Sequence, residues 1–318
     1  MPLVSVVLIF LNEERFIEEA VQSVRDQTLT DWELILVDDG STDQSTTTAR
    51  ALAAGDAKIR YVNHVGHENR GMSASRNLGV AHATSPYIAF LDADDVWVSS
   101  KLAEQVDLLD SNPEVAMVHG AMLFWHSWDS SATRVDKLVL TAGLADRRLD
   151  PPEGALAVKP LGRGPTGGVD VLVRRSVFDA VGGFEERFRG LFEDQAFFLK
   201  VCLHFPIYIS SRNWLLYRKH NASCNALTKP TDYWRQRGVF LDWLQEDAGR
   251  LADSRVEVAF RRARRQFMYR RFAAPLQEVF NWLPEGSRER VKRVLGMGRA
   301  GASLHVNVGR RQESGPGR

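Results

Sequence analysis

The first third of this 318-residue chain alternates short apolar runs with segments of helical periodicity. These runs lie at 3–10, 32–37, 59–65 and 87–91, of which the third also contains Arg60, Asn63 and His64. Helical patterns at 13–24, 43–54, 72–83 and 101–109 separate and follow them. The first run, LVSVVLIF, is apolar almost throughout, as a strand covered on both faces requires. This alternation of strand and helix predicts a doubly wound, mostly parallel α/β sheet.

Polar residues gather where two of these predicted strands end. The pair Asp38-Asp39 follows the second run, and the sequence Asp92-Ala93-Asp94-Asp95 follows the fourth. Ligands of doubly wound sheets bind beyond the carboxyl ends of the strands. We therefore expect the site at this edge of the sheet, with Asn12 capping the first helix.

Composition excludes several classes of protein. A hydrophobic share of 44% argues against intrinsic disorder as the main state, and two cysteines cannot form a disulfide framework or a zinc ribbon. No stretch approaches the roughly 18 apolar residues that a membrane span needs. The apolar N-terminus runs directly into Asn12-Glu13-Glu14, which indicates a buried strand rather than a signal peptide. We expect a cytoplasmic protein.

The net charge of +1 conceals a strong asymmetry. Residues 1–248 contain 25 basic and 34 acidic side chains, whereas residues 249–318 contain 16 and 6. Segment 255–272 interleaves arginines with apolar residues, which suits either a peripheral helix on the anionic cytoplasmic face of a membrane or a helix packed on the acidic body. Nucleic acid is not expected as a partner, because the body lacks a basic stripe. Dimerisation through the C-terminal helices stays open.

The three aspartates after the fourth run repel one another unless a cation or strong donors compensate them. Oxygen ligands at this density suit an Mg²⁺ or Mn²⁺ ion that is shared with substrate phosphates. The alternative to a metal site is a surface turn that caps the following helix. Asp39 is expected to contact a ligand. Arg76 could pair with a diphosphate or with the aspartates.

Two further segments carry candidate chemistry. Glu193-Asp194 precedes an apolar helix, where it could supply a helix cap or a general base. His220 follows a β-like run at 214–217 and is a candidate for a metal or diphosphate contact. Helices are also expected at 233–244, 256–272 and 288–295, followed by a disordered tail from residue 309.

Seven segments in order resemble glycosyltransferase family 2, which has the GT-A fold. They are VSVVLIFLNEE, ELILVDDGSTD, GMSASRNLGVA, YIAFLDADD, GGFEERF, FEDQAFFLKV and YRKHNAS. Together they span roughly residues 3–225. The resemblance implies a catalytic domain at 1–225. It does not cover the rest of the chain, where charge and helical periodicity predict a basic helical region at 226–308 and a tail at 309–318.

The resemblance also implies an activity and a set of site residues. Family members transfer a sugar, with inversion, from a nucleotide-diphospho-sugar, most often a uridine diphosphate sugar, to a hydroxyl group. Asp194 matches the general base, with Glu193 beside it. The donor-binding positions are Phe10, Asn12, Glu14, Asp39, Arg76, Asp92 and Ala93. The metal-binding positions are Asp92, Asp94 and Asp95, with His220 as a further candidate.

The acceptor that these expectations suggest is a glycan or a lipid-linked glycan of the cell envelope. Two alternatives stay open. A nucleotidyltransferase would need a glycine-rich phosphate loop where this chain has Phe10-Leu11-Asn12-Glu13. A nucleotide-sugar-binding protein without turnover would not need the aspartates and Asp194 that this chain retains.

Overall fold

The computed structural model describes residues 1–166, 170–248, 253–273 and 286–287. The strands are β1 Val4–Phe10, β2 Trp32–Asp38, β3 Ile59–Asn63, β4 Tyr87–Asp92, β5 Val96–Trp97, β6 Met117–Trp125, β7 Lys137–Val139, β8 Arg147–Leu149, β9 Val171–Arg174 and β10 Ile207–Arg218. The helices are α1 Ile17–Arg25, α2 Ser45–Gly55, α3 Met72–His82, α4 Lys101–Ser111, α5 Glu153–Ala157, α6 Arg175–Ala180, α7 Glu193–His204, α8 Cys224–Leu227, α9 Pro230–Ala248 and α10 Ser254–Met268.

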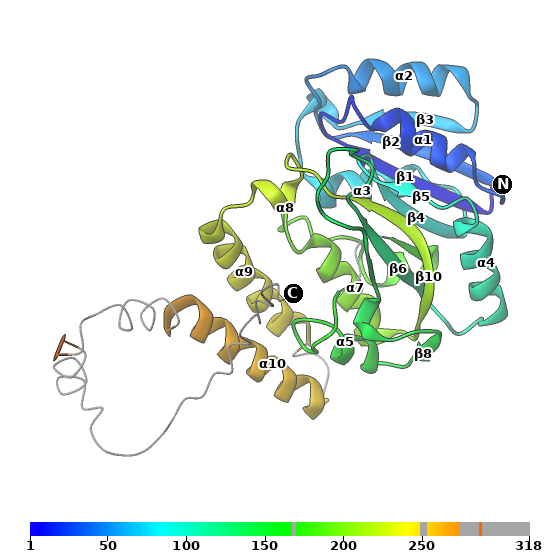
Figure 1. Cartoon of the computed structure of the whole chain (residues 1–318). Coiled ribbons are helices and arrows are strands. Elements are labelled where there is room, and N and C mark those ends of the chain that lie inside the picture. The colour runs from blue at the N-terminus through cyan, green and yellow to red at the C-terminus, as the bar shows by residue number, and fades with distance from the viewer. Residues whose placement is uncertain (167–169, 249–252, 274–285, 288–318) are drawn as a thin grey trace, which may run out of the picture. The chain divides into compact units, whose positions relative to one another are not determined.

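The strands of the described residues form one mixed sheet (Figure 1). Its main order is β3-β2-β1-β4-β9-β6-β10-β5, with β7 beside β6 and β8 beside β10. The first four are parallel, β9 is antiparallel to both neighbours, and β10 runs parallel to β6. The expectation of a doubly wound, mostly parallel α/β sheet is therefore confirmed for the N-terminal half.

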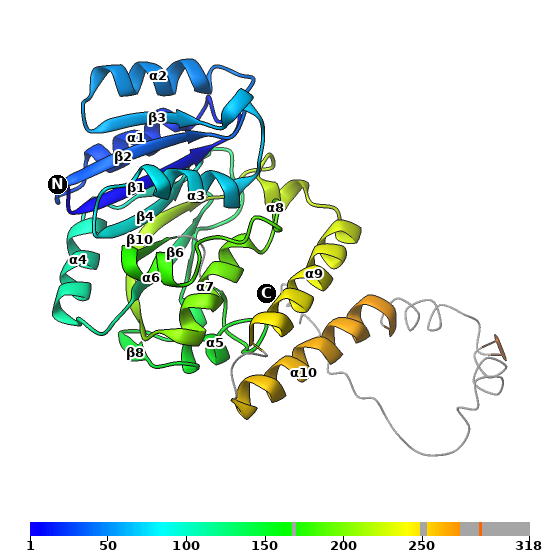
Figure 2. The same ribbon diagram turned by 180° about the vertical axis from the view of Figure 1, so that it is seen from behind.

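Both faces of the sheet are buried, as the apolar first run predicted. Alternate residues of β1 point to opposite faces, so Val7 and Ile9 join one hydrophobic core while Val6 and Leu8 join the other. Helices α3, α7, α9 and α10 contribute to the first core, and α1 and α4 to the second. Figures 1 and 2 show the two faces in turn.

The expected helices of the first third are present, but two begin later than the pattern indicated. Helix α1 begins at Ile17, and α2 begins at Ser45. Asn12 does not cap α1, because its side chain accepts a hydrogen bond from the backbone of Thr42 instead. The sequence pattern located both helices, whereas long-range contacts of the preceding loops determined where each begins.

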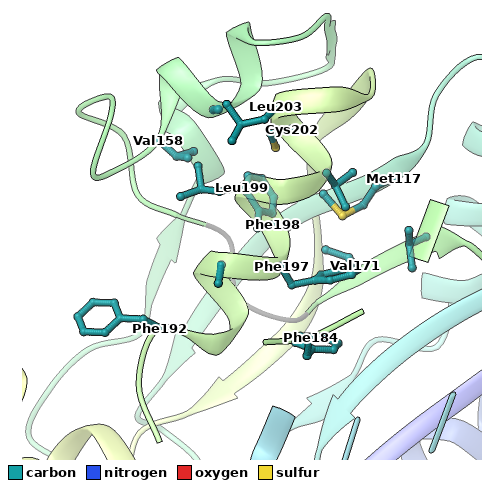
Figure 3. Packing of buried hydrophobic residues seen from close by; sticks show 14 of the residues in the cluster. Met117, Val158, Val171, Phe184, Phe192, Phe197, Phe198, Leu199, Cys202 and Leu203 are labelled. Atoms are coloured by element: carbon teal, nitrogen blue, oxygen red, sulfur yellow. The ribbon is translucent and has the colours of Figure 1, made fainter. Parts of the chain in front are cut away.

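Helix α7 packs against the centre of the sheet (Figure 3). Its residues Phe197 and Phe198 are almost fully buried, and the ring of Phe197 stacks on that of Phe184 with centroids 4.4 Å apart. The apolar face of α7 therefore fixes the position of its first turn, which carries Glu193 and Asp194.

Residues Met1–Phe267 form one compact unit. Helix α9 and most of α10, which follow the predicted boundary at 225/226, belong to this unit, and the boundary stays a prediction. In α10 the apolar residues Val256, Phe260 and Phe267 are buried, as expected for a helix packed on the body. The helix expected at 288–295 and the tail from 309 lie outside the described residues. None of the helices in the described ranges has the length and apolarity of a membrane span.

We expect Gly79→Ala to lower the free energy of unfolding by about 1–3 kcal/mol, as overpacking of a core does. A β-carbon at Gly79 would lie 2.3 Å from Cγ1 of Val7 and 3.0 Å from Cγ2 of Val37, so α3 would have to move off the sheet. Gly55→Ala in α2 is the control, since a β-carbon there meets nothing within 4 Å. Urea unfolding should show at most a gain of ~1 kcal/mol for the control, and equal stability of both variants would contradict this packing.

Candidate active site

The parallel strands bring the expected site segments to one edge of the sheet. Phe10 ends β1 opposite Asp38, the last residue of β2, and Ile9 is opposite Asp92, the last residue of β4. The backbone N–H of Arg218 at the end of β10 donates to Oδ1 of Asp95 at 2.8 Å. The turns after β1, β2, β4 and β10 therefore meet at this edge, as the doubly wound pattern predicted.

The loop after β1 is fastened to the loop after β2. Asn12, at φ 58°, accepts a hydrogen bond from the N–H of Thr42 at 2.7 Å, and its own N–H donates to Oγ of Ser41 at 3.0 Å. Glu14 accepts from the N–H of Gln44 at 3.1 Å. Asn12 and Glu14 therefore fix the shape of this edge through loop contacts, and their exposed side chains border it.

Asp38 and Asp39 are both buried and organise neighbouring loops. Asp38 accepts hydrogen bonds from the N–H groups of Gly40 and Ser41 at 3.1 and 2.8 Å. Asp39 accepts from the N–H groups of Arg70 and Gly71 at 2.8 and 3.0 Å. The carboxylate expected to contact a ligand thus also holds the loop that leads into α3.

The three aspartates after β4 have three different partners. Asp92 is paired with Arg76 at 2.7 Å, Oδ2 of Asp94 lies 3.0 Å from Nε2 of His220, and Asp95 binds the N–H of Arg218. Burial, together with the charge of Asp94, raises the pKa of Asp95 well above its usual range. Burial also raises the pKa of Asp92, although Arg76 acts in the opposite direction. Ala93 is buried between them.

Asp94 and His220 are the pair whose chemistry suits a divalent ion. In the described part of the chain, no three His, Cys, Asp or Glu side chains are grouped so that they could hold a metal by themselves. A carboxylate oxygen and an imidazole nitrogen beside a substrate diphosphate still fit Mg²⁺ or Mn²⁺, which commonly bind through one or two carboxylates plus phosphates. The side chain of Asp95 is buried and turned to backbone, so it is not brought into this pair.

Arg76 connects the aspartate turn with helix α7. Its guanidinium is 1% exposed and lies 2.7 Å from Oδ1 of Asp92 and 3.5 Å from Oε1 of Glu193. The ring of Phe184 lies beneath it, with the centroid 5.3 Å from Cζ. Of the two roles considered for Arg76, neutralisation of the aspartates is therefore present in the structure.

Glu193 and Asp194 occupy the first turn of α7, directly after Phe192 at φ 72°. Burial, followed by the charge of Glu193, raises the pKa of Asp194 to about 7, whereas Arg76 lowers it. Burial is also the largest cause of the raised pKa of Glu193. A carboxyl group that titrates near neutrality can exchange a proton with a bound molecule at physiological pH.

Side chains of α3 also hold the loop that precedes Glu193. Asn77 accepts a hydrogen bond from the N–H of Phe184 and donates to its carbonyl oxygen, both at 2.9 Å. A β-carbon on Gly183 would lie 2.7 Å from Oδ1 of Asn77, so this close approach requires glycine. The segments GMSASRNLGVA and GGFEERF are thus in direct contact.

Two residues of this edge were not assigned to the site from the sequence. Glu13 was expected only as a first-turn helix residue, yet burial and the charge of Asp94 raise its pKa to about 7. Arg218 was quoted only as part of the YRKHNAS segment. Its place at a strand end, two residues before the candidate His220, was the signal that could have indicated it.

We expect Asp194→Asn to change how stability depends on pH. With a folded-state pKa near 7 and an ordinary value of 3.8, the folded chain retains the proton between about pH 4 and 7 while the unfolded chain loses it. The contribution of Asp194 to the free energy of unfolding therefore falls as pH rises through this window.

The asparagine variant lacks this contribution, so it should gain stability relative to the wild type between pH 5 and pH 8. Urea unfolding at both pH values measures the difference, with Asp179→Asn on the exposed side of α6 as the control. A difference between wild type and Asp194→Asn that does not vary with pH would contradict the raised pKa.

Comparison with known proteins agrees with this geometry. Residues 5–139 match the family described as Glycosyl transferase family 2. The chain is 42% identical over 106 residues to EpsJ, an uncharacterized glycosyltransferase of Bacillus subtilis (strain 168), covering 33% of this chain and 30% of that protein. It is 32% identical over 118 residues to the Escherichia coli protein named UDP-Glc:alpha-D-GlcNAc-diphosphoundecaprenol beta-1,3-glucosyltransferase WfgD, covering 37% and 45%. The matched regions thus span about a third to a half of the length of these relatives.

Solved structures agree in fold. S. aureus TarS 1-349 in complex with UDP-GlcNAc superposes with a TM-score of 0.65 at 17% identity, over 93% of this chain and 80% of that one. The mannosyltransferase PcManGT from Pyrobaculum calidifontis, in complex with GDP-Man and Mn²⁺, gives a TM-score of 0.54 at 17% identity with the same coverage. With the strand order described above, these similarities show that the chain has the GT-A fold and that its residues 5–139 match the model of glycosyltransferase family 2.

Proposed function

We propose that this protein is an inverting glycosyltransferase that moves a sugar from a nucleotide-diphospho-sugar to a hydroxyl group of a glycan or lipid-linked glycan. The observation that carries the proposal is the link through Arg76 between Asp92 and Glu193. It joins the aspartate turn to the helix end that carries Asp194, so one edge of the sheet can serve both the donor and the acceptor.

The acceptor side of the reaction rests on Asp194. Inversion is a single in-line displacement, in which the acceptor hydroxyl attacks the anomeric carbon as the bond to the diphosphate breaks. Asp194 accepts the hydroxyl proton, and a pKa near 7 suits a base that works at neutral pH. The ion pair with Arg76 fixes the position of the Glu193 carboxylate, which lies next to this base in the sequence.

The donor side rests on residues at the turns after β1, β2, β4 and β10 and on Arg76 of α3. Phe10, Asn12, Glu14 and Asp39 would border the nucleoside, and Arg76, Asp92 and Ala93 would lie towards the ribose and the diphosphate. Asp94 and His220, together with the diphosphate of the donor, would hold a divalent ion, Mg²⁺ or Mn²⁺. When bound, such an ion supplies Lewis-acid stabilisation of the charge on the departing diphosphate.

Uridine diphosphate sugars are the donors we propose. The support is a fold shared with TarS, whose structure contains UDP-GlcNAc, and a sequence match to WfgD, whose name includes UDP-Glc. A guanosine diphosphate sugar is the donor to test next, since PcManGT holds GDP-Man with Mn²⁺. The name of WfgD also includes a diphosphoundecaprenol-linked sugar, which supports an envelope glycan as the product.

We expect Asp94→Ala and Asp194→Asn each to reduce the rate of sugar transfer, the latter by about 10²–10⁴-fold as for loss of a general base. Release of nucleoside diphosphate from a panel of nucleotide-sugars with Mn²⁺ measures this rate. Asp179→Asn serves as the control, because its carboxylate is exposed on α6 and its ion-pair partner is Arg175 at 3.9 Å. Wild-type rates in both site variants would refute the proposed mechanism.

A peripheral position on the cytoplasmic face of the membrane completes the proposal. The apolar face of α10 is buried, so contact with anionic lipid would involve the exposed arginines of the helix, such as Arg261 and Arg265. We expect wild-type protein to sediment with vesicles that contain phosphatidylglycerol. Replacing both arginines by glutamine should weaken binding roughly 30-fold at about 1 kcal/mol for each basic residue.

Arg235→Gln is the control for this experiment, because Arg235 is an exposed arginine of α9 and lies outside α10. Equal binding of the double variant and the control would exclude α10 as the contact surface. Absence of wild-type protein from the vesicle pellet would exclude the membrane contact altogether.

A further inference from the structure

We propose that Arg218 is a positioning residue that holds Asp94 and His220 in place for the metal and the diphosphate. The inference rests on the proposed function, because it concerns the donor side of the same site. Arg218 is 4% exposed and ends β10, two residues before His220. Its contacts reach the turn after β4, helix α1 and the end of β6.

Three polar contacts fix Arg218 and the aspartate turn together. Its Nε donates to the carbonyl oxygen of Asp94 at 2.7 Å, and its backbone N–H donates to Oδ1 of Asp95 at 2.8 Å. Its Nη2 donates to Oε2 of Glu19, on α1, at 2.6 Å. The main chain of Asp94 and the side chain of Asp95 are therefore both bound by one residue.

Three aromatic rings surround the same guanidinium. Its Cζ lies 4.5 Å from the ring centroid of Phe16, 4.7 Å from that of Trp125 and 5.0 Å from that of Trp128. A cation over aromatic faces is attracted by their quadrupoles, more strongly when it is desolvated. Ion pairing with Glu19 and this aromatic cage together restrict the guanidinium to one place.

The chain after Arg218 is held as firmly, and this transmits the constraint to His220. The N–H of Lys219 donates to the carbonyl oxygen of Trp125 at 3.0 Å, and Nε1 of Trp128 donates to the carbonyl oxygen of Lys219 at 3.1 Å. His220 then packs edge-on to Phe16 with centroids 5.3 Å apart and meets Asp94 at 3.0 Å. Arg218 thus controls both members of the Asp94–His220 pair.

Lysine cannot reproduce this arrangement. The guanidinium binds a carbonyl oxygen and a carboxylate in two fixed directions, whereas an ammonium is a single point charge on a flexible stem. Replacing Arg218 by lysine retains the charge but gives up the contact to Asp94 or the contact to Glu19. Partners that orient metal ligands typically contribute about 10–100-fold to metal affinity.

The test compares Arg218→Lys with Arg174→Lys. Arg174 is a matched control: it ends β9, donates to the carbonyl oxygens of Val115 and Leu109 at 2.8 and 2.7 Å, and lies over the ring of Tyr87. Binding of Mn²⁺, alone and with uridine diphosphate, is followed by the electron paramagnetic resonance signal of the free ion. Thermal unfolding of each variant is measured in parallel.

We expect Arg218→Lys to raise the dissociation constant of Mn²⁺ about tenfold or more. Arg174→Lys should leave this constant unchanged, although it should lose as much thermal stability as Arg218→Lys does. Glu19 is half-exposed, and Glu19→Gln leaves the hydrogen bond from Arg218 to Asp94 in place. This variant should therefore give a smaller rise in the dissociation constant of Mn²⁺. Wild-type Mn²⁺ affinity in Arg218→Lys would overturn the positioning role alone. Absence of Mn²⁺ binding by the wild type would overturn this inference and the proposed metal together.

Discussion

The arrangement of the site depends on one buried cation, Arg76. Removing a guanidinium from water is costly unless acidic partners compensate it, and Asp92 and Glu193 lie on either side of Arg76. Those partners come from β4 and α7, which are about 100 residues apart in sequence. Charge neutralisation therefore joins the turn after β4 to the first turn of α7, whose position the apolar face of that helix also fixes.

Loop contacts supply the rest of the geometry. The turn after β1 is bound to the turn after β2 through Asn12 and Glu14, and Asp39 holds the segment that leads into α3. At the other side, Arg218 holds the aspartate turn. Several side chains that a motif would assign to a ligand are thus also structural, which explains why polar residues are so dense at this edge.

Much of the fold was accessible from the sequence. The apolar runs located β1, β2 and β4, because strands buried on both faces need nearly continuous apolar residues. Edge strand β3 is only partly buried, and its place in the strand–helix alternation located it. The start of α1 could not be predicted from the sequence, because Asn12 could either cap that helix or bind Thr42. Only the folded chain brings Thr42 within reach of Asn12. The partners of Asp92, Asp94 and Asp95 were likewise undecidable, because each lies on a different, distant element.

By itself, the sequence determined the α/β architecture, the edge at which the acidic turns gather and the identity of the carboxylates, because these follow from local periodicity and strand ends. Tertiary structure decided which carboxylate faces which cation, where Arg218 acts and that the pKa of Asp194 rises to about 7. Those properties arise from burial and from charges on separate elements, and only folding creates either of them.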